Sequence, residues 1–522
     1  MTITRRDFLN NMALVGGYAA TFSAMQALGM MARAEASTLP SMGADFGKGR
    51  KVVILGGGVA GLVAAYELRK AGFVPIVLEA ATRPGGRNWS ARKGTTVAFV
   101  DGTKQTCDWD DGHYFNMGPA RIPSIHTHLL AYCSELGVQL EVEINTSRST
   151  LMQADAMNGG KPVEQRRVLH DTRGYLAELL AKAVDRHTLD DVLSAADLER
   201  LKDLLRGFGD LNEKMLYTGT ERGGYAIARA AGPDVAKFNT PIPLAELLAA
   251  DMSKGEFYEE HIDWQATMFQ PIGGMDRIPY AFADSLGEIV QYDAPVSEVR
   301  NTSKGVQVRY AQGGKPMKID ADFCICTVPA PILKDIKGNL TPRTMAAAKA
   351  IKANPLYKVA WEAPRFWEKE KNIYGGISFL KQTVDLVWYP SAKLFSPKGV
   401  IVSGFNLEVD DEGRPTAFGK LGSMEAKLAA SQQAVETLHP GHGADLAKPI
   451  YINWGQIPYQ LGCVGQTDLP GAQDAYAQLN NGPDGRVWFA ADWLSRLSGW
   501  QEGAILSAHR AIAGIAAQVS AA

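Results

Sequence analysis

The sequence predicts an α/β fold in which a Rossmann-like dinucleotide-binding domain is combined with a mixed-sheet domain and a helical insert. Three observations predict it. An apolar strand, a glycine-rich turn and a helix follow one another between Lys51 and Ala71. A further strand, turn and helix stand at the other end of the chain, in Arg486–Ala504. Between them lie a segment of helical periodicity and a long stretch rich in aromatic and β-branched residues.

The first element is a strand that leads into a glycine fingerprint. Val52–Leu55 is an unbroken apolar run, which is typical of a buried parallel strand. Gly56, Gly58 and Gly61 follow with the spacing G-x-G-x-x-G. The first glycine allows a tight turn, the second lets the backbone approach a pyrophosphate, and the third lets helix and strand pack closely. We expect the helix Val59–Ala71 to present its positive N-terminal dipole to the phosphates.

A second strand completes the dinucleotide unit. Val74–Leu78 is again apolar, and Glu79 follows it at the position that accepts hydrogen bonds from a ribose diol. The next residues, Arg83–Arg87, read RPGGR. In that turn the two glycines would let the chain pass close to a diphosphate, and Arg87 would supply positive charge.

The middle of the chain predicts a helical insert followed by a β-rich region. In Asp171–Leu216, Leu198, Leu201 and Leu205 share one helical face, with Leu204 at its edge. Residues 268–330 return to strands, and 350–460 read as a mostly β domain. Val487–Ala490 is a last strand before an alanine-rich helix.

Several motifs resemble one family of flavoproteins. Glu79 and the RPGGR turn form E-x5-G-G-R, a pattern similar to that of FAD enzymes of the glutathione-reductase type and of the amine oxidase group. Gln270–Pro279 resembles the loop that opens the second FAD segment of amine oxidases, and the strand at Val296 resembles the one that holds adenine. The resemblance implies FAD as cofactor. The cofactor-binding residues that it implies are Gly56, Gly58, Ala60, Gly61, Glu79, Ala80, Gly86, Arg87, Gly118, Pro119, Ala120, Arg121, Val296, Asp492 and Trp500.

A second set of motifs resembles L-amino-acid oxidases within that group. Asn116–Pro123 reads NMGPARIP, and in that family the arginine, here Arg121, binds the substrate carboxylate. A guanidinium suits this task because it is always charged and matches a carboxylate bidentately. Asp385–Ser391 resembles the strand whose tyrosine gives a second carboxylate contact. This assigns Tyr389, with Trp388 as the alternative, because adjacent strand residues face opposite ways.

The C-terminal turn resembles the part of the family that closes the site. Asp492 stands where the family contacts the ribityl-phosphate side of FAD. Ser498–Trp500 resembles a small-Gly-aromatic turn, in which the Gly499 carbonyl would accept from the substrate amine and the Trp500 ring would form a wall.

The chain departs from the family pattern at two places. In the family that the sequence resembles, a lysine holds a water at the flavin N5 edge and lies ten residues before the Trp of an F-W pair. In this chain the residue ten positions before Trp367 is Tyr357. Lys358, the next residue, is the expected catalytic lysine if the strand has a one-residue deletion. Cys463 raises a covalently attached flavin as an alternative, because monoamine oxidases have a Gly-Cys-Tyr near this position, although here Val464 replaces the tyrosine.

The resemblance implies an FAD-dependent enzyme that oxidises L-amino acids with dioxygen to 2-oxo acid, ammonia and hydrogen peroxide. Lys358 and Trp500 would be its catalytic residues, and Arg121, Tyr389, Gly499 and Trp500 would bind substrate. The alternatives are a monoamine or polyamine oxidase, an amino-acid 2-monooxygenase, and an FAD-stabilised binding protein without turnover.

Composition and the N-terminus set the remaining expectations. The net charge of −2 over 522 residues does not favour a nucleic-acid partner, and five cysteines without CxxC do not indicate a disulfide framework. His126 and His128 in IHTH have no partner Cys/His cluster, so the sequence predicts no metal site. Thr4–Asn10 reads TRRDFLN before an apolar stretch and a small-residue cleavage site, which resembles a twin-arginine export signal and predicts a periplasmic or secreted protein. A permanent membrane anchor is the alternative reading. A homodimer is one option for the assembly.

These observations divide the chain as follows. The expected parts are a signal peptide in 1–36, an FAD-binding domain in 48–112, 268–330 and 475–522, a substrate-binding domain in 113–165 and 331–474, and a helical insert in 166–267.

Overall fold

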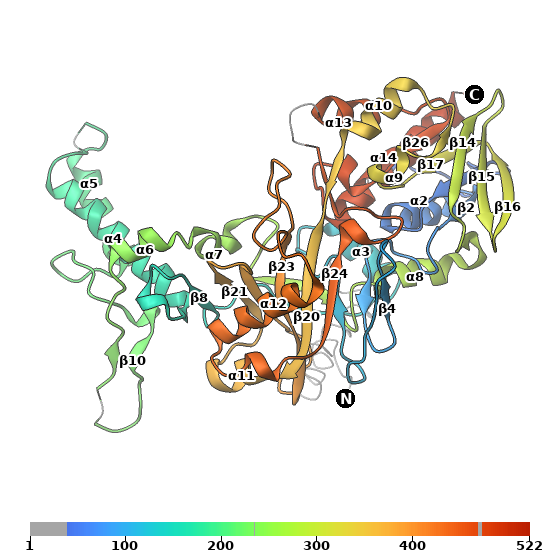
Figure 1. Ribbon diagram of the computed structural model, residues 1–522. Coiled ribbons are helices and arrows are strands. Elements are labelled where there is room, and N and C mark those ends of the chain that lie inside the picture. Colours follow the sequence, from blue (N-terminus) through green and yellow to red (C-terminus); the bar gives the residue numbers. More distant parts are fainter. Residues whose placement is uncertain (1–38, 190, 234, 468–471, 522) are drawn as a thin grey trace, which may run out of the picture.

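The structure is a computed structural model that describes residues 39–189, 191–233, 235–467 and 472–521. The export signal expected in 1–36 lies outside the described residues. Within these ranges, no helix is both long enough and apolar enough to cross a lipid bilayer. Figure 1 shows two lobes built around sheets and an arm that projects from one of them.

The first lobe contains the predicted dinucleotide-binding sheet. Its five strands are all parallel and have the order β13-β2-β1-β17-β26. They come from three distant parts of the sequence, so the sheet forms only when both ends of the chain meet. The prediction of an α/β fold with a Rossmann-like domain is confirmed. The strands are β1 (Lys51–Leu55), β2 (Val74–Leu78), β13 (Val290–Gln291), β17 (Phe323–Cys326) and β26 (Val487–Phe489).

This sheet is buried on both faces, which explains why its strands are apolar without alternation. Val52 and Ile54 pack with the helices on one face, whereas Val53 and Leu55 point into the core of the other. The helices of the first face are α2 (Val59–Lys70), α8 (Arg277–Leu286) and α14 (Gln501–Ser520). The opposite face is covered by β14 (Val296–Asn301), β15 (Val306–Gln312), β16 (Lys315–Ala321), β18 (Lys337–Gly338), α9 (Ala330–Leu333), α10 (Pro342–Ala350) and α13 (Ala472–Asn480).

The second lobe is built on a seven-stranded mixed sheet of order β24-β20-β23-β22-β21-β8-β9. Only β21 and β8 run parallel. Five of the strands come from the stretch predicted to be mostly β, and α12 (Met424–Leu438) packs against the sheet (Figure 1). The strands are β8 (Leu151–Gln153), β9 (Val163–Glu164), β20 (Leu356–Pro364), β21 (Gly376–Leu380), β22 (Leu386–Tyr389), β23 (Lys398–Leu407) and β24 (Ala447–Asn453).

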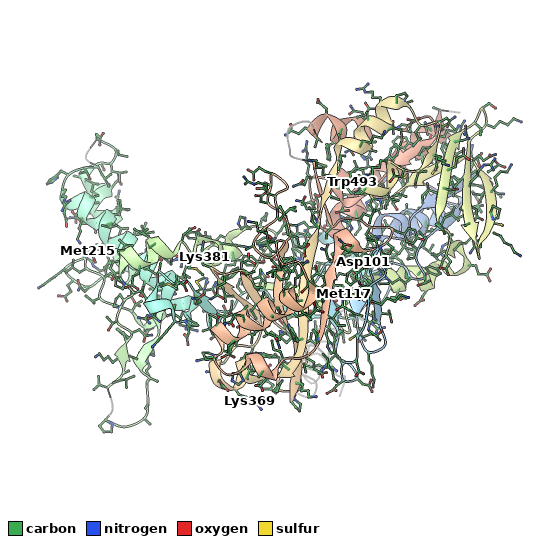
Figure 2. The ribbon with its side chains drawn as sticks, viewed as in Figure 1. Asp101, Met117, Met215, Lys369, Lys381 and Trp493 are labelled. Carbon is green, nitrogen blue, oxygen red and sulfur yellow. The ribbon has the colours of Figure 1, made fainter. Side chains whose placement is uncertain are left out.

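The arm is a pair of helices with a small hairpin beyond it (Figure 1). Leu198 and Leu205 are buried between α4 and α5, and Leu204 is 66% exposed, as the helical spacing predicts. In Figure 2 Met215 lies on this arm, well away from Met117 in the body. The arm and its return consist of α4 (Gln165–Asp185), α5 (Ala195–Gly209), β10 (Tyr225–Ile227), β11 (Lys237–Phe238), α6 (Leu244–Ala250) and α7 (Ser253–Glu256).

A two-stranded antiparallel pair joins the lobes next to the site. β7 (Leu140–Ile144) pairs with β12 (Thr267–Pro271), so the end of the arm segment returns beside the chain that follows the NMGPARIP motif. An isolated bridge between Ile122 and Phe269 extends this contact. The residues after the arm are therefore brought next to Arg121.

Candidate active site

A cavity of about 450 Å³ runs from the glycine turn after β1 to the mixed sheet of the second lobe. Both ends of the chain contribute to its walls. Of the residues predicted from the sequence, those that line it are Gly56, Gly58, Ala60, Glu79, Ala80, Gly86, Arg87, Gly118, Pro119, Ala120, Arg121, Val296, Lys358, Asp492, Gly499 and Trp500. Gly61 and Tyr389 do not line it.

The glycine turn has the geometry that its spacing predicts. Gly56 has φ +105°, a conformation that L side chains rarely adopt. A Cβ on Gly61 would lie 2.0 Å from the Gly56 carbonyl oxygen, so this glycine permits the close packing of α2 on β1. Gly61 thus acts behind the cavity wall rather than on its surface.

The N-terminus of α2 is open toward the cavity. Its N-cap residue, Gly58, offers no side chain, and a Cβ placed there would meet no atom within 4 Å. The first turn of α2 contains no acidic residue. Uncapped backbone N–H groups and an unobstructed approach are the features that a bound pyrophosphate requires.

Glu79 is held rigidly beside this turn. It is 6% exposed, and its carboxylate accepts hydrogen bonds from the backbone N–H of Gly57 at 2.6 Å and of Ala81 at 2.7 Å. Burial raises the pKa of Glu79, and these two hydrogen bonds oppose the shift. A fixed carboxylate at the end of β2 has lone pairs left for the hydroxyl groups of a ribose.

Arg87 and Asp492 close the cavity from opposite ends of the sequence. They form an ion pair in which Arg87 Nη1 also lies 3.2 Å from Asp492 Oδ2. The same Oδ2 accepts from the Gly499 N–H at 3.0 Å, which orients the turn before Trp500. Arg87 also donates to the Cys463 carbonyl oxygen. Cys463 itself lines the cavity, so the alternative of a covalent flavin stays a prediction.

Arg121 lies at the other end of the cavity in an aromatic enclosure. It is 7% exposed, and it donates to Asn145 Oδ1 and, at 2.8 Å, to Tyr258 Oη. Its Cζ lies 4.6 Å from the centre of the Trp388 ring and 5.4 Å from that of Trp264. Neither hydrogen-bond partner carries a charge, and the acid that interacts with Arg121 is Glu143, whose pKa burial raises to about 7. The guanidinium can therefore still bind an anionic ligand.

The prediction for Tyr389 needs correction. Its hydroxyl lies 2.9 Å from Ser378 Oγ and 2.7 Å from His439 Nε2, in the core on the far side of the strand from the cavity. Trp388, the alternative, lines the cavity instead. The alternation of side chains along β22 permits only one of these neighbours to face Arg121, and the fold selects the tryptophan.

Lys358, rather than Tyr357, reaches the cavity. Tyr357 stacks on Phe418 with ring centres 3.6 Å apart, within the core of the second lobe. Lys358 is 2% exposed and donates to the carbonyl oxygens of Asn116 at 2.9 Å and Gly118 at 2.5 Å. Burial lowers the pKa of Lys358 to about 7. With this pKa, a substantial fraction of Lys358 is the neutral amine at neutral pH, and that form is able to accept a proton.

Sequence reasoning did not identify four residues around Arg121. Tyr258 and Trp264 come from the segment after the arm, which the sequence could not place. Asn145 and Glu143 follow no motif. Only the isolated aromatic character of Trp264 and Tyr258 was visible in the sequence. Their role depends on the pairing of β7 with β12.

Curated proteins of similar sequence are oxidases of amino acids. An L-amino-acid oxidase of the snake Notechis scutatus scutatus is 24% identical over 482 residues, which cover 88% of this chain and 85% of that protein. A flavin-dependent L-tryptophan oxidase of Lentzea aerocolonigenes is 24% identical over 507 residues, covering 90% of this chain and 98% of the relative.

Solved structures of similar fold include two amine oxidases. Putrescine oxidase bound to putrescine has a TM-score of 0.59 and 20% identity, with 91% of this chain and 99% of that chain covered. Cyclohexylamine oxidase from Brevibacterium oxydans also has a TM-score of 0.59, at 17% identity, covering 90% and 99% of the two chains. At these identities the likeness shows the fold alone.

A family model described as flavin containing amine oxidoreductase matches residues 59–515. The cofactor is therefore FAD, and the residues present fit it: an open helix N-terminus for the pyrophosphate, a fixed carboxylate for a ribose, and a cavity that continues to Lys358 and Arg121. Because the match covers well over half of the chain, from the helix after the glycine turn to the C-terminal helix, this chain belongs to the family of flavin-containing amine oxidoreductases.

Proposed function

We propose that this chain oxidises L-amino acids to 2-oxo acids, with dioxygen as the electron acceptor and ammonia and hydrogen peroxide as the other products. Arg121 carries the proposal. A buried guanidinium that faces the cavity and has only neutral hydrogen-bond partners is suited to a carboxylate. A substrate without a carboxylate would leave this guanidinium without a bidentate anionic partner, and Glu143 would be the acid that attracts it electrostatically.

Each side chain has a defined task in this reaction. Arg121 holds the substrate carboxylate, and the rings of Trp264 and Trp388 exclude water around the pair. Lys358, as the neutral amine, takes a proton from the substrate ammonium, so that the amine lone pair is available. Trp500 forms a wall of the cavity. Bound FAD would supply the two-electron oxidation of the α-carbon, with dioxygen as the final acceptor.

The curated relatives support this substrate class, since both act on L-amino acids by name. The structural neighbours act on amines, so an amine oxidase is the second candidate. Against it stands Arg121, which would repel an ammonium in the same cavity. Lys358 and Arg121 are both basic groups at that end of the cavity.

The test compares two substrates that differ only in the carboxylate. Purified holoprotein is assayed for peroxide release with each common L-amino acid and with phenethylamine as the partner of phenylalanine. We expect phenylalanine to be the better of the pair. Arg121→Met should lower kcat/KM for amino acids by about 100-fold, the equivalent of about 3 kcal/mol. Arg121→Lys is the matched control, because it keeps the positive charge but cannot bind a carboxylate bidentately. Its kcat/KM for amino acids should lie between those of the wild type and Arg121→Met.

Product analysis separates the remaining alternatives. Ammonia and a 2-oxo acid support oxidative deamination, whereas carbon dioxide and an amide would identify an amino-acid 2-monooxygenase. If none of the tested substrates reduces the bound flavin, the protein would be an FAD-stabilised binding protein without turnover. A preference for phenethylamine over phenylalanine would overturn the proposal in favour of an amine oxidase.

We also propose that the protein is exported through the twin-arginine route. Arg5 and Arg6 in TRRDFLN support this, because they form the arginine pair that such a signal carries. The route carries folded proteins, which suits an enzyme that must bind FAD before export.

A further inference from the structure

A second, smaller cavity adjoins the large one at Lys358. It has a volume of about 80 Å³, and its walls include the exposed Gly112 and Lys393 at one end and the buried Lys358 and Glu143 at the other. We call it the rear cavity. Lys358 and Trp388 line both cavities, so they form part of the wall between them.

Glu143 is the unusual residue of the rear cavity. It is 2% exposed, and its Oε1 accepts from Trp388 Nε1 at 3.1 Å. Its Oε2 has no hydrogen-bond partner among the described residues. Leaving a buried carboxylate oxygen without a partner lowers stability, and the cost is larger when the group is charged. That oxygen is therefore suited to take up a proton or to bond to water in the rear cavity.

Lys358 borders the large cavity and can receive a proton as the neutral amine. A neutral amine has two N–H bonds, and the carbonyl oxygens of Asn116 and Gly118 accept both. This leaves the nitrogen lone pair without a donor. Substrate and cofactor fill the large cavity during reaction, so a proton received there needs another way out.

We propose that the rear cavity is the exit route for the proton that the substrate ammonium loses, with Lys358 as its acceptor and Glu143 as its relay to the surface. The inference rests on the proposed function. One N–H bond of the ammonium breaks, and its proton joins the lone pair of Lys358 Nζ. An N–H bond of Lys358 then breaks, and the proton passes through water to Glu143 Oε2. The carboxyl finally releases it to water at the outer opening, which restores both groups.

The ionisation of both groups is consistent with this relay. Burial raises the pKa of Glu143 to about 7, against the opposing charge of Arg121 and the hydrogen bond from Trp388. Burial lowers the pKa of Lys358 to about 7, so a proton moves between them at little cost. The other titratable groups that line the rear cavity are Tyr114 (which contacts Glu141), His113 (paired with Glu362), Arg365 (paired with Glu368), Tyr389 (hydrogen-bonded to Ser378 and His439) and Lys393. Arg121 acts on Glu143 from the large cavity.

The test combines two variants with one control. Glu143→Gln keeps an acceptor for Trp388 but cannot exchange a proton. Glu141→Gln changes an acid on the same strand that does not line the rear cavity, and it serves as control. Anaerobic reduction of the flavin by phenylalanine is followed by stopped flow. Glu143→Gln should slow reduction by about 10-fold or more and increase the solvent isotope effect, whereas Glu141→Gln should leave both unchanged.

A second variant blocks the route without removing the acid. Val400 lines the rear cavity and not the large one, so Val400→Phe narrows the passage and should slow reduction in the same way. Infrared difference spectra give a readout that does not need turnover. Between solutions below and above pH 7, the wild type should show the carbonyl band of a protonated carboxyl, and Glu143→Gln should lack it.

The outcomes are separable from those of the substrate screen. If no amino acid is oxidised, the proposed function fails, and the infrared band still reports on Glu143. If amino acids are oxidised but reduction is equally fast in the wild type, Glu143→Gln and Val400→Phe, the exit route is wrong. Failure of Glu143→Gln to fold leaves Val400→Phe and the infrared spectrum of the wild type to decide.

Discussion

Arg87 and Asp492 form an ion pair across a sequence separation of 405 residues. The side chain of Asp492 is 7% exposed and that of Arg87 23%. The pair joins the turn after β2 to the turn before α14, which are the two walls of the cofactor end of the cavity. Sequence analysis assigned both residues to the cofactor, and their contact with each other is a finding of the tertiary structure.

Asp492→Asn should weaken FAD binding and lower the stability of the holoprotein. The substitution leaves the half-buried guanidinium of Arg87 without a counter-charge and weakens the hydrogen bond from the Gly499 N–H, at a cost of about 2 kcal/mol. FAD titration by flavin fluorescence and thermal unfolding measure the effect. Asp111→Asn is the control, because its ion pair with Lys93 is exposed and its loss should change neither quantity measurably. Equal FAD affinity in Asp492→Asn and Asp111→Asn would show that the Arg87–Asp492 ion pair does not contribute to FAD binding.

Tyr389 and Trp388 should respond differently to substitution. Tyr389→Phe removes hydrogen bonds to Ser378 and His439 and should lower stability by about 1 kcal/mol, with KM for amino acids unchanged. Trp388→Phe should raise KM, because it alters the ring over Arg121 and removes the donor to Glu143. Urea unfolding and steady-state kinetics distinguish the two. An increased KM in Tyr389→Phe alone would restore the assignment made from the sequence.

Flavin reduction should become faster as the pH rises through about 7, since the neutral form of Lys358 accepts the substrate proton. Lys358→Met should abolish this rise and lower the rate. The measurement is anaerobic reduction against pH, with the wild type as reference. A rise that persists unchanged in Lys358→Met would assign the titration to another group.

The same lysine should shape the pH dependence of stability. The pKa of Lys358 is about 7 in the folded chain, below its ordinary value of 10.5, so the unfolded chain binds the extra proton between these values. Stability therefore rises with pH across this window, and the penalty of burying the lysine is complete below pH 7. The difference in Tm between Lys358→Met and the wild type should shift in favour of the wild type as the pH rises from 7 toward 10. A difference independent of pH would contradict this.

Export should depend on the two arginines of TRRDFLN. Replacing Arg5 and Arg6 together by lysine keeps the charge and should retain the protein in the cytoplasm, as judged by cell fractionation and peroxide release from the periplasmic fraction. Arg33→Lys, near the expected cleavage site, is the matched control and should be exported. Export of the double variant would show that the protein is exported by a signal other than the arginine pair.

Local sequence determined the dinucleotide unit, because its requirements are local. Gly56 needs a positive φ, Gly61 needs close packing, and the acid must follow the second strand, so spacing alone identifies the turn and Glu79. Arg121 could be identified from the sequence in the same way, since it lies within a continuous motif.

Only the tertiary structure decided which side chains surround that arginine. Strand alternation allowed either Trp388 or Tyr389 to face the cavity, and the packing of β22 between β21 and β23 made the choice. Tyr258 and Trp264 reach Arg121 because β12 returns beside β7 after a long excursion through the arm. Glu143 is buried and its side chain is hydrogen-bonded to Trp388. The residues next to it in the sequence do not indicate this environment. Contacts between distant segments depend on the free energy of the whole packed core, and a short stretch of sequence does not contain that information.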